Sequence, residues 1–271
     1  MSEHSAQHRP HVVDFTDATL ALGERTLWQE LTLSVHAGEF IAVLGPNGSG
    51  KTTLLRAILG QVPLTSGSLT LHGRLGYVPQ QHADDSDSMA LRGRDLVGFG
   101  VDGASWGIGW RGRRRRVRRV DAAIAEVGAT AYADAPLGLL SGGEQQRLRI
   151  AQALTNDPGI LLCDEPLSSL DLHNQRLVVD LLNARRRSRD TAILFVTHEI
   201  NPVLPYVDRV LYLVDGRFRI GTVAEVMNSA TLSELYGSHV EVAEVAGRLV
   251  VIGGDGDGDH HHHCDEQGID L

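Results

Sequence analysis

The segment Gly45–Thr53 constrains the fold of this chain more than any other, because it fits the phosphate-loop pattern G-x-x-x-x-G-K-[ST]. The run before it, Phe40–Leu44, is short, apolar and partly β-branched, which predicts a buried strand. The run after it, Thr52–Leu59, predicts a helix that ends at Gly60. Strand, glycine-rich loop and helix form a phosphate cradle, in which backbone N–H groups and a helix N-terminus face the anion. The sequence therefore predicts a nucleotide-binding α/β fold.

Lys51 is the only lysine among the 25 lysine and arginine residues of the chain. A compact ammonium and a planar guanidinium are not interchangeable at a phosphate site, which supports a binding role for this lysine. We expect Lys51 to contact the β- and γ-phosphates and the Thr52 hydroxyl to bind Mg²⁺. The residues expected to hold the phosphates are Gly45, Pro46, Asn47, Gly48, Ser49, Gly50, Lys51, Thr52 and Thr53.

Composition narrows the class of protein and its compartment. A length of 271 residues suits one large α/β domain with insertions, and a net charge of −9 argues against a general nucleic-acid binder. No stretch approaches the roughly 18 apolar residues of a membrane span, and Met1–Pro10 is polar without a signal-peptide core. The distant Cys163 and Cys264 give no disulfide framework, as in a reducing compartment. We therefore expect a cytoplasmic protein that reaches a membrane only through a partner.

Strand-like runs flank the phosphate loop and a helical region follows them. Val12–Phe15 and Leu31–Val35 predict a small β-subdomain, and Gly67–Leu71 and Leu75–Pro79 predict two more strands. The segment 82–140 then changes to polar, helical stretches broken by glycine-rich turns. We expect it to form a separate helical subdomain.

An arginine-rich helix is the clearest element of that segment. Apolar residues recur at helical spacing from Arg113 to Val127, and six arginines crowd the first two turns. A solvated helix start, a nucleic-acid contact and a contact with an anionic membrane surface all fit this charge.

A second glycine-rich helix start and two strand ends carry further polar groups. Leu140–Arg147 opens a helix through Leu154, and its glycine pair offers backbone amides to an anion. The buried run Ile160–Pro166 contains Asp164 and Glu165, which alternation along a strand would point to different sides. One acid could then bind Mg²⁺ and the other face an attacking water. His198 follows the strand Ala192–Thr197, at the edge where ligands of open α/β sheets bind.

Taken in order, these motifs resemble those of the ATP-binding subunit of an ABC transporter. The resemblance covers about residues 12–252, and the element Leu140–Gln145 separates this class from other phosphate-loop proteins. It implies a phosphate-loop NTPase core of the RecA-like type with an antiparallel β-subdomain and an inserted α-helical subdomain. The cofactors it implies are ATP and Mg²⁺.

The resemblance also implies a role for each matching residue. Glu165 would be the general base that polarises water, and His198 would contact the γ-phosphate. Gln80 would sense the γ-phosphate and Mg²⁺ and couple to the membrane subunit, while Asp164 would support Mg²⁺. Removal of the Glu165 carboxylate should then leave ATP binding largely intact, because a base that activates water contributes about 10²–10⁴ in rate.

The remaining matches imply partners. Ser141 and Gly143, in the element that also holds Gly142 and Glu144, would contact ATP on the other subunit of a head-to-tail homodimer. Asp171 would lie on the loop that joins the two sites. The partners implied are integral-membrane permease subunits and, through them, an extracytoplasmic metal-binding protein, with no nucleic acid. The subunit would then lie on the inner face of the cell membrane.

One position departs from the family pattern. An aromatic side chain usually stacks on adenine roughly where Leu22 stands. Leu22 offers an apolar contact without π-stacking, so the preference for ATP over GTP is open unless Phe15 or Trp28 takes this role.

Within the family, the run Leu91–Leu140 and the end, Leu232–Gly237 followed by Val240–Val242, resemble subunits of zinc and manganese importers. The tail that follows has a composition typical of metal binding. Imidazole and thiolate beside carboxylates suit Zn²⁺ better than Mn²⁺. A solvated acidic end and a purification tag are the alternatives, and the Gly/Asp repeats predict a flexible segment in which a site forms only on binding. The candidate Zn²⁺ ligands are His260, His261, His262, His263 and Cys264.

These observations predict an ATP-binding domain at 12–221 with its helical subdomain at 82–140. A short C-terminal element at 222–253 and a flexible, acidic, His-rich tail at 254–271 follow. The predicted function is ATP hydrolysis that drives uptake of a divalent metal, zinc first, through a separate permease. The alternatives are an importer or exporter of another solute, manganese first, and a soluble ABC ATPase that acts on nucleic acid.

Overall fold

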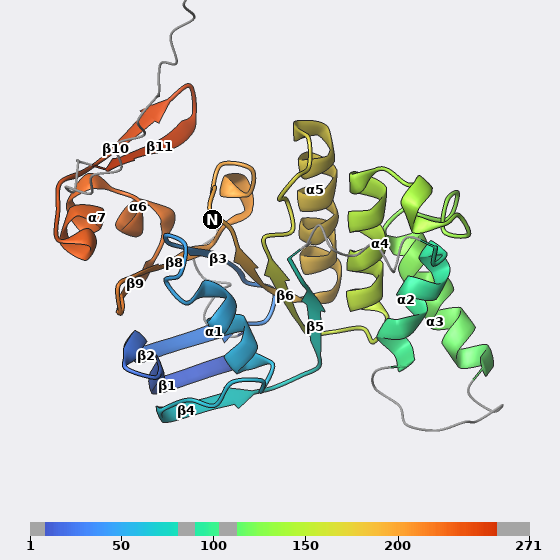
Figure 1. The fold of residues 1–271 in the computed structure, drawn as a ribbon, viewed down its shortest axis with the longest axis horizontal. Helices are drawn as coiled ribbons and strands as arrows, with labels where there is room; N and C mark the ends of the chain where they lie inside the picture. Colours follow the sequence, from blue (N-terminus) through green and yellow to red (C-terminus); the bar gives the residue numbers. More distant parts are fainter. Residues whose placement is uncertain (1–8, 81–89, 103–112, 254–271) are drawn as a thin grey trace, which may run out of the picture.

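The computed structural model describes residues 9–80, 90–102 and 113–253, and a mixed sheet forms the centre of this part of the chain (Figure 1). Its strand order is β5-β6-β7-β3-β8-β9, and only the β8–β9 pairing is antiparallel. The strands are β3 (Phe40–Leu44), β5 (Leu75–Val78), β6 (Ile160–Asp164), β7 (Ala192–Val196), β8 (Arg209–Val214) and β9 (Arg217–Gly221).

The central strands are apolar along their whole length because both faces of the sheet are covered. Every residue of β3, β6 and β7 is buried, which is usual for parallel strands between two layers. Alternate residues of β3 enter different cores: Phe40 and Ala42 face one cluster, and Ile41 and Val43 face the other.

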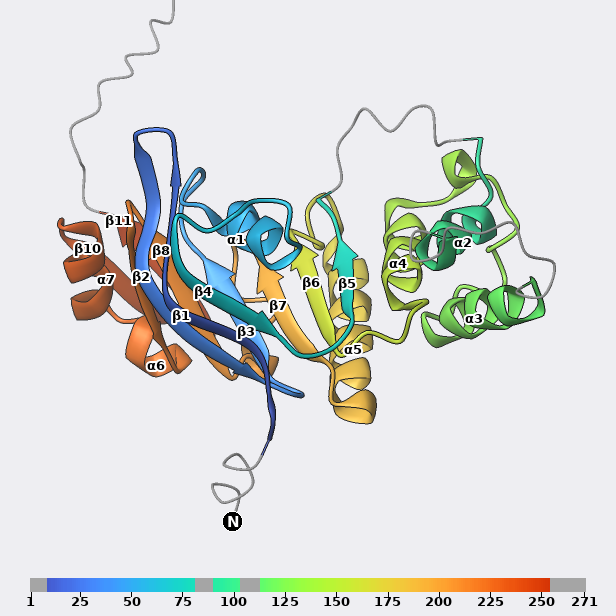
Figure 2. The same cartoon turned by 90° about the horizontal axis from the view of Figure 1, so that it is seen from below.

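An antiparallel sheet and α1 (Lys51–Ile58) cover the second of these faces (Figure 2). The sheet order is β2-β1-β4, with β1 (His11–Leu22), β2 (Arg25–His36) and β4 (Ser66–Leu71). Phe15 and Trp28 fill the space beneath it, with ring centroids 6.0 Å apart in an edge-to-face arrangement.

Helices cover the first face and extend to one end of the molecule (Figure 1). Within the described residues α2 packs against α3 and α4, and α4 packs against α5. These helices are α2 (Gly93–Asp102), α3 (Arg113–Glu126), α4 (Gly142–Leu154) and α5 (Leu172–Arg189).

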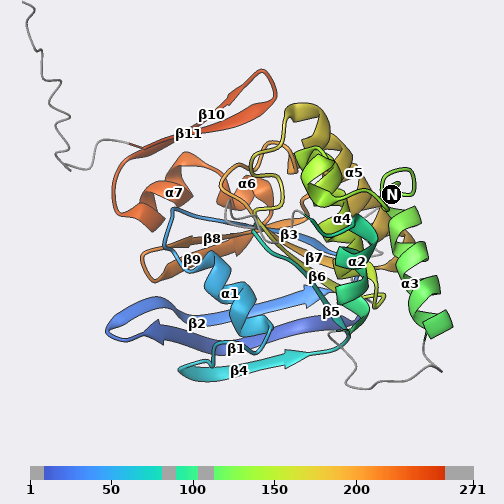
Figure 3. The same cartoon turned by 45° about the vertical axis from the view of Figure 1, so that its right-hand side comes forward.

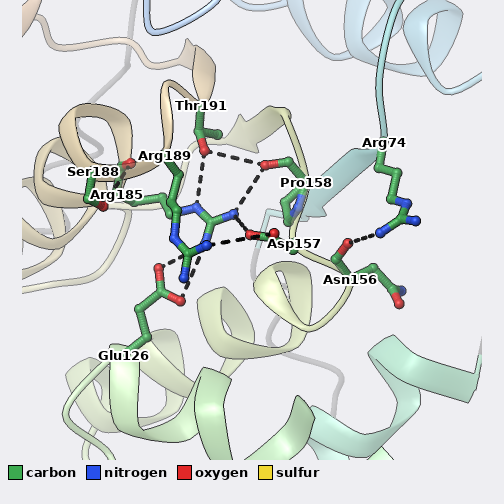
Figure 4. A network of polar contacts seen from close by, with 9 residues as sticks. All are labelled: Arg74, Glu126, Asn156, Asp157, Pro158, Arg185, Ser188, Arg189 and Thr191. Carbon is green, nitrogen blue, oxygen red and sulfur yellow. Dashed lines mark hydrogen bonds and ion pairs between the residues drawn. The ribbon is translucent and has the colours of Figure 1, made fainter. Parts of the chain in front are cut away.

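A buried arginine joins this helical end to the core (Figure 4). The Arg185 side chain of α5 is only 3% exposed, and its guanidinium donates to both carboxylate oxygens of Glu126, at the end of α3, at 3.1 and 3.3 Å. It also donates to Asp157 Oδ1 at 2.5 Å, Thr191 Oγ1 at 3.1 Å and the Pro158 carbonyl at 3.3 Å. We call this group the Arg185 network.

The C-terminal segment lies at the opposite end (Figure 3). Helix α6 (Val223–Val226) and helix α7 (Ser229–Tyr236) lead into a hairpin of β10 (Val240–Val245) and β11 (Arg248–Gly253). Left-handed φ angles of 50° at Ala246 and 74° at Gly247 give the two-residue turn a twist that suits a hairpin.

The predicted fold class is confirmed, and several predicted elements are found with shifted ends. The phosphate-loop helix runs from Lys51 to Ile58, and Gly60 follows with a φ of +70°. The strands predicted at Val12–Phe15 and Leu31–Val35 are parts of longer strands that meet in a β1–β2 hairpin. Helix α5 and the β8–β9 pair lay outside the sequence predictions. No helix in the described ranges is long and apolar enough to cross a membrane.

Candidate active site

The phosphate loop follows the carboxyl end of β3, as the sequence predicted. Gly45 has a φ of +140°, and a Cβ there would come within 2.1 Å of the Leu213 carbonyl oxygen, so only glycine fits. Gly50 caps the start of α1 with a φ of +98°, and no side chain caps this helix. The first-turn N–H groups of α1 are therefore available to a phosphate.

Lys51 lies inside this loop rather than in solvent. Its side chain curls back, and Nζ donates to the carbonyl oxygens of Gly45 at 2.7 Å and Pro46 at 2.8 Å. Burial lowers the pKa of the ammonium, while the charges of Glu165 and Asp164 oppose that shift. Ser49 Oγ is buried without a hydrogen-bond partner in the described structure. An orphaned hydroxyl and a turned-in ammonium fit a phosphate group at this loop.

Asp164, the last residue of β6, gathers the groups that fit a divalent cation. Thr52 Oγ1 donates to its Oδ1 at 3.1 Å, and the Tyr77 hydroxyl approaches its Oδ2 at 3.4 Å. Burial, with the nearby Glu165 charge, raises the pKa of Asp164 despite the Thr52 hydrogen bond. Burial and the neighbouring Asp164 carboxylate raise the pKa of Tyr77 to about 12. A hydroxyl beside a crowded carboxylate is a donor set suited to Mg²⁺.

A turn, rather than strand alternation, sets the direction of the Glu165 side chain. Strand β6 ends at Asp164, and Glu165 has a left-handed φ of +46°. The turn directs its carboxylate toward Gln80, whose Nε2 donates to Oε2 at 3.1 Å. His198 Nδ1 lies 3.7 Å from the same oxygen, on a side chain that is 65% exposed. The structure thus brings Gln80, Glu165 and His198 together beside the phosphate loop.

The Leu140–Arg147 element lies elsewhere in the same chain. Ser141 caps α4, and Glu144 Oε2 accepts from the Ser141 amide at 2.9 Å and from its hydroxyl at 2.8 Å. Figure 1 shows α4 separated from α1 by β6 and β5. Gly142 and Gly143 instead adjoin the start of α5, because a Cβ at Gly142 would meet Leu170 in the preceding loop and a Cβ at Gly143 would meet Asn174 in the first turn. Ser141–Glu144 and the phosphate loop of one chain do not form one pocket.

Asp171 begins α5 beside these glycines. Its carboxylate accepts from the Asn174 amide at 2.8 Å and from the Asn174 side chain at 2.8 Å. These bonds lower the pKa of Asp171. The residue therefore caps a helix in the isolated chain.

The position expected to receive adenine has no aromatic side chain available. Leu22 is 51% exposed, whereas Phe15 and Trp28 are 1% and 0% exposed in the core, so neither ring can stack on a base. Arg25, which the sequence reasoning missed, pairs with Leu22 across the hairpin and donates from Nη2 to the Gly48 carbonyl at 3.0 Å. Tyr77 was also missed, because only its register beside β6 places it near Asp164.

A phosphate loop beside Gln80, Glu165 and His198 also occurs together with a family-wide sequence pattern. A sequence profile described as "ABC transporter" matches residues 28–168. The chain belongs to the ABC transporter family. It is an ATP-binding, ATP-hydrolysing subunit of that family, and ATP with Mg²⁺ is the substrate pair that the family implies.

Relatives of this ABC subunit serve several transport systems. The hemin import ATP-binding protein HmuV of Rhodopseudomonas palustris is 37% identical, over 83% of this chain and 87% of its own length. The zinc transport system ATP-binding protein TroB of Treponema pallidum is 34% identical over 85% and 88%. The manganese transport system ATP-binding protein MntB of Bacillus subtilis is 32% identical over 84% and 93%.

Solved structures agree on the fold of the ABC subunit. A dimeric ATP-binding cassette in a post-hydrolysis state with ADP and Pi is 27% identical, with a TM-score of 0.65 over 78% of this chain and 98% of that one. A transporter assigned to the metal-chelate type, in an inward-facing conformation, is 25% identical with a TM-score of 0.76 over 89% and 96%.

The structure does not describe the predicted metal ligands of the tail. His260, His261, His262, His263 and Cys264 lie outside the described residues. Within residues 9–80, 90–102 and 113–253, no group of three or more His, Cys, Asp or Glu side chains could hold a metal ion.

Proposed function

We propose that this ABC subunit hydrolyses ATP to power import of a divalent metal ion, zinc first, through a separate membrane permease. The observation that supports this substrate class is the likeness to the zinc and manganese transport subunits over more than four-fifths of the chain. The ATP site alone says nothing of the cargo, because the groups that contact a nucleotide serve every transported solute.

We call the phosphate loop with Gln80, Asp164, Glu165 and His198 the catalytic edge, and it acts through positioning and charge. The α1 N-terminus and Lys51 would hold the phosphates, and Thr52 with Asp164 would hold Mg²⁺, which when bound neutralises charge on the phosphate oxygens. Glu165 would accept a proton from water, with its carboxylate beside Gln80 and His198. His198 would contact the γ-phosphate, and Gln80 would sense this phosphate and relay its presence to the permease.

A homodimer supplies what one chain lacks. Ser141 and Gly143 lie apart from the phosphate loop of their own chain, so a second copy in head-to-tail orientation would bring them to the bound ATP. Asp171, at the start of α5, would lie on the loop that joins the two sites. The solved dimeric cassette with ADP and Pi is a precedent for this arrangement in a related protein. We place the dimer at the inner face of the cell membrane, held there by permease subunits that an extracytoplasmic metal-binding protein loads.

Hemin import is the second candidate, favoured by the 37% identity to a hemin import subunit. A soluble ATPase that acts on nucleic acid is disfavoured. The exposed arginines of α3, Arg114, Arg115 and Arg118, are its only support, and no salt-dependent binding of duplex DNA or RNA is expected.

The cargo can be tested in cells that lack the gene and carry either the wild-type subunit or the Lys51→Ala variant. Total zinc and manganese are measured by elemental mass spectrometry under limitation of each metal, and growth is measured with hemin as the sole iron source. We expect total zinc to fall selectively in cells that lack the gene. The wild-type subunit should restore the zinc content, and the Lys51→Ala variant should not. A selective fall in manganese, or loss of growth on hemin alone, would replace zinc with that cargo.

The tail is proposed to bind Zn²⁺ through His260–His263 and Cys264 as a cytoplasmic sensor. Deletion of 255–271 should change the response of ATPase activity to added zinc and leave basal hydrolysis intact. Calorimetric titration of the full chain and of the deleted chain with Zn²⁺ measures the site directly. Equal heats from the two proteins would remove this role.

A further inference from the structure

We propose that Asn201 is a positioning residue, which fixes the loop bearing His198 to the C-terminal β10–β11 hairpin. Asn201 follows His198 by three residues. Its Nδ2 donates to the Leu249 carbonyl at 2.9 Å, and its Oδ1 accepts from the Leu249 amide at 2.8 Å. One side chain thus satisfies both backbone groups of one residue in β11, 48 positions along the chain. The inference rests on the role proposed above for His198.

The hairpin offers these groups because Leu249 lies on an open edge. The register pairs Leu249 with Glu244, and the turn at Ala246–Gly247 makes Val245 and Arg248 the last hydrogen-bonded pair. By the alternation of an antiparallel ladder, the amides of Leu249 and Val251 both point outward from β11. The Asn201 amide occupies the outer edge at Leu249 as a neighbouring strand would.

Leu249 packs against the core cluster that contains Ile200, and a cavity lies beside this contact, between the hairpin and the phosphate loop. Its volume is about 700 Å³, and it separates the phosphate loop and His198 from the inner side of β11. The residues that line its two sides include Pro46, Asn47, His198, Leu249 and Val251. The Asn201–Leu249 hydrogen bonds therefore add a directional link to the apolar contact at the border of this cavity.

The His198 loop has few other fixed points. Strand β7 ends at Val196, and Thr197 Oγ1 makes a local turn by accepting from the Glu199 amide at 3.1 Å. Ile200 is buried and anchors the middle of the loop. The His198 ring itself is mostly exposed, and its recorded polar contact is the 3.7 Å approach to Glu165. Holding Asn201 therefore restricts the direction in which the His198 ring can point.

The test compares ATP turnover of full-length variants. Asn201→Ala removes both bonds, and we expect kcat to fall about tenfold while KM for ATP stays within about twofold, because displacement of a catalytic group affects the chemical step. Leu249→Pro removes the amide that Asn201 accepts from, and proline is tolerated where an edge amide points outward. It should lower kcat in the same direction. Val251→Pro is the matched control, since its outward amide has no recorded partner in the described structure, and it should leave kcat unchanged.

Double variants separate this inference from the role of His198. If Asn201 acts through His198, adding Asn201→Ala to His198→Ala should cause no further loss. A His198→Ala variant with normal kcat would refute the proposed role of His198 itself. A His198→Ala variant with low kcat beside a normal Asn201→Ala variant would overturn only the positioning role. Equal losses for Leu249→Pro and Val251→Pro would overturn it as well, because they would report general damage to the hairpin.

Discussion

The two polar networks of this subunit, around Arg185 and around Glu165, differ in how completely their groups are satisfied. The Arg185 guanidinium is buried and donates to two carboxylates, a hydroxyl and a carbonyl. At the catalytic edge two carboxylates adjoin each other, and the Ser49 hydroxyl has no partner in the described structure. A satisfied buried network fixes one geometry, whereas unmet acceptors and crowded charges are completed by a ligand. The comparison distinguishes the Arg185 network, which anchors the helical end, from the groups around Glu165, which form a ligand site.

Glu165→Gln is the strongest test of the catalytic side. Loss of the proton acceptor should lower kcat by about 10²–10⁴ while ATP binding stays within a few fold, since the amide keeps the shape and the contact with Gln80. Phosphate release and equilibrium ATP binding measure the two effects. Glu199→Gln, which removes an exposed acid from the loop that follows β7, is the control, and this variant should hydrolyse ATP at the normal rate. Unchanged turnover in the Glu165 variant would refute its role as base.

Arg185→Met tests the anchor. Removal of the guanidinium leaves Glu126 and Asp157 without their partner, and we expect a loss of about 2 kcal/mol in the free energy of unfolding, less than for a fully buried pair because both acids reach solvent. Denaturant unfolding measures it. The exposed Arg187→Met change on the same helix should cost less than about 0.5 kcal/mol. Equal losses in the two variants would mean that the network does not anchor the helical end.

Asp157→Asn tests the Arg185 network through the pH dependence of stability. The Arg185 hydrogen bond lowers the pKa of Asp157, so its stabilisation is full above the ordinary carboxyl pKa and is lost as pH falls through the lowered value. Because the Asp157 side chain is 62% exposed and solvent screens the pair, we expect the variant to be less stable by about 0.5 kcal/mol at pH 7 and equal to the wild type in strong acid. Thermal unfolding across pH checks this. A difference that persists in strong acid would assign the effect to packing.

Asp164→Asn should change stability in the opposite direction. Burial raises the pKa of Asp164, so ionisation costs stability above the raised value, and this cost disappears as pH falls toward the ordinary carboxyl pKa. Without nucleotide or Mg²⁺, the variant should be more stable by about 1 kcal/mol at neutral pH. Thermal unfolding without Mg²⁺ is the measurement. A lower melting temperature would place Asp164 with the anchor instead of the site.

The sequence predicted the parts of the site that local pattern encodes. The strand, glycine loop and helix around Lys51 follow from spacing within one segment, and Asp164 and His198 follow from the ends of apolar runs. Glu165 shows the limit, because its left-handed φ of +46° lies at a residue type that gives no signal of it.

Long-range pairs could not be predicted from the sequence. Arg185 and Glu126 are 59 residues apart, and Asn201 and Leu249 are 48 apart, so no periodicity connects them. Buried polar pairs of this kind depend on how helices and strands pack, which propensity and pattern do not specify. The exclusion of Phe15 and Trp28 from the adenine position likewise became visible only when both rings were found in the core.

The turned-in side chain of Lys51 has a consequence for protein labelling. Lys51 carries the only side-chain amine in the sequence. This residue is 6% exposed, and the pKa of its ammonium is lowered. Amine acylation proceeds through the neutral form, so the reagent has a single internal target that sits where phosphate would bind. The mass of one adduct, counted with and without nucleotide, would therefore report occupancy of the loop. Amine cross-linkers and amine-coupled surfaces, in contrast, would modify this subunit only at its terminus or at its own active site.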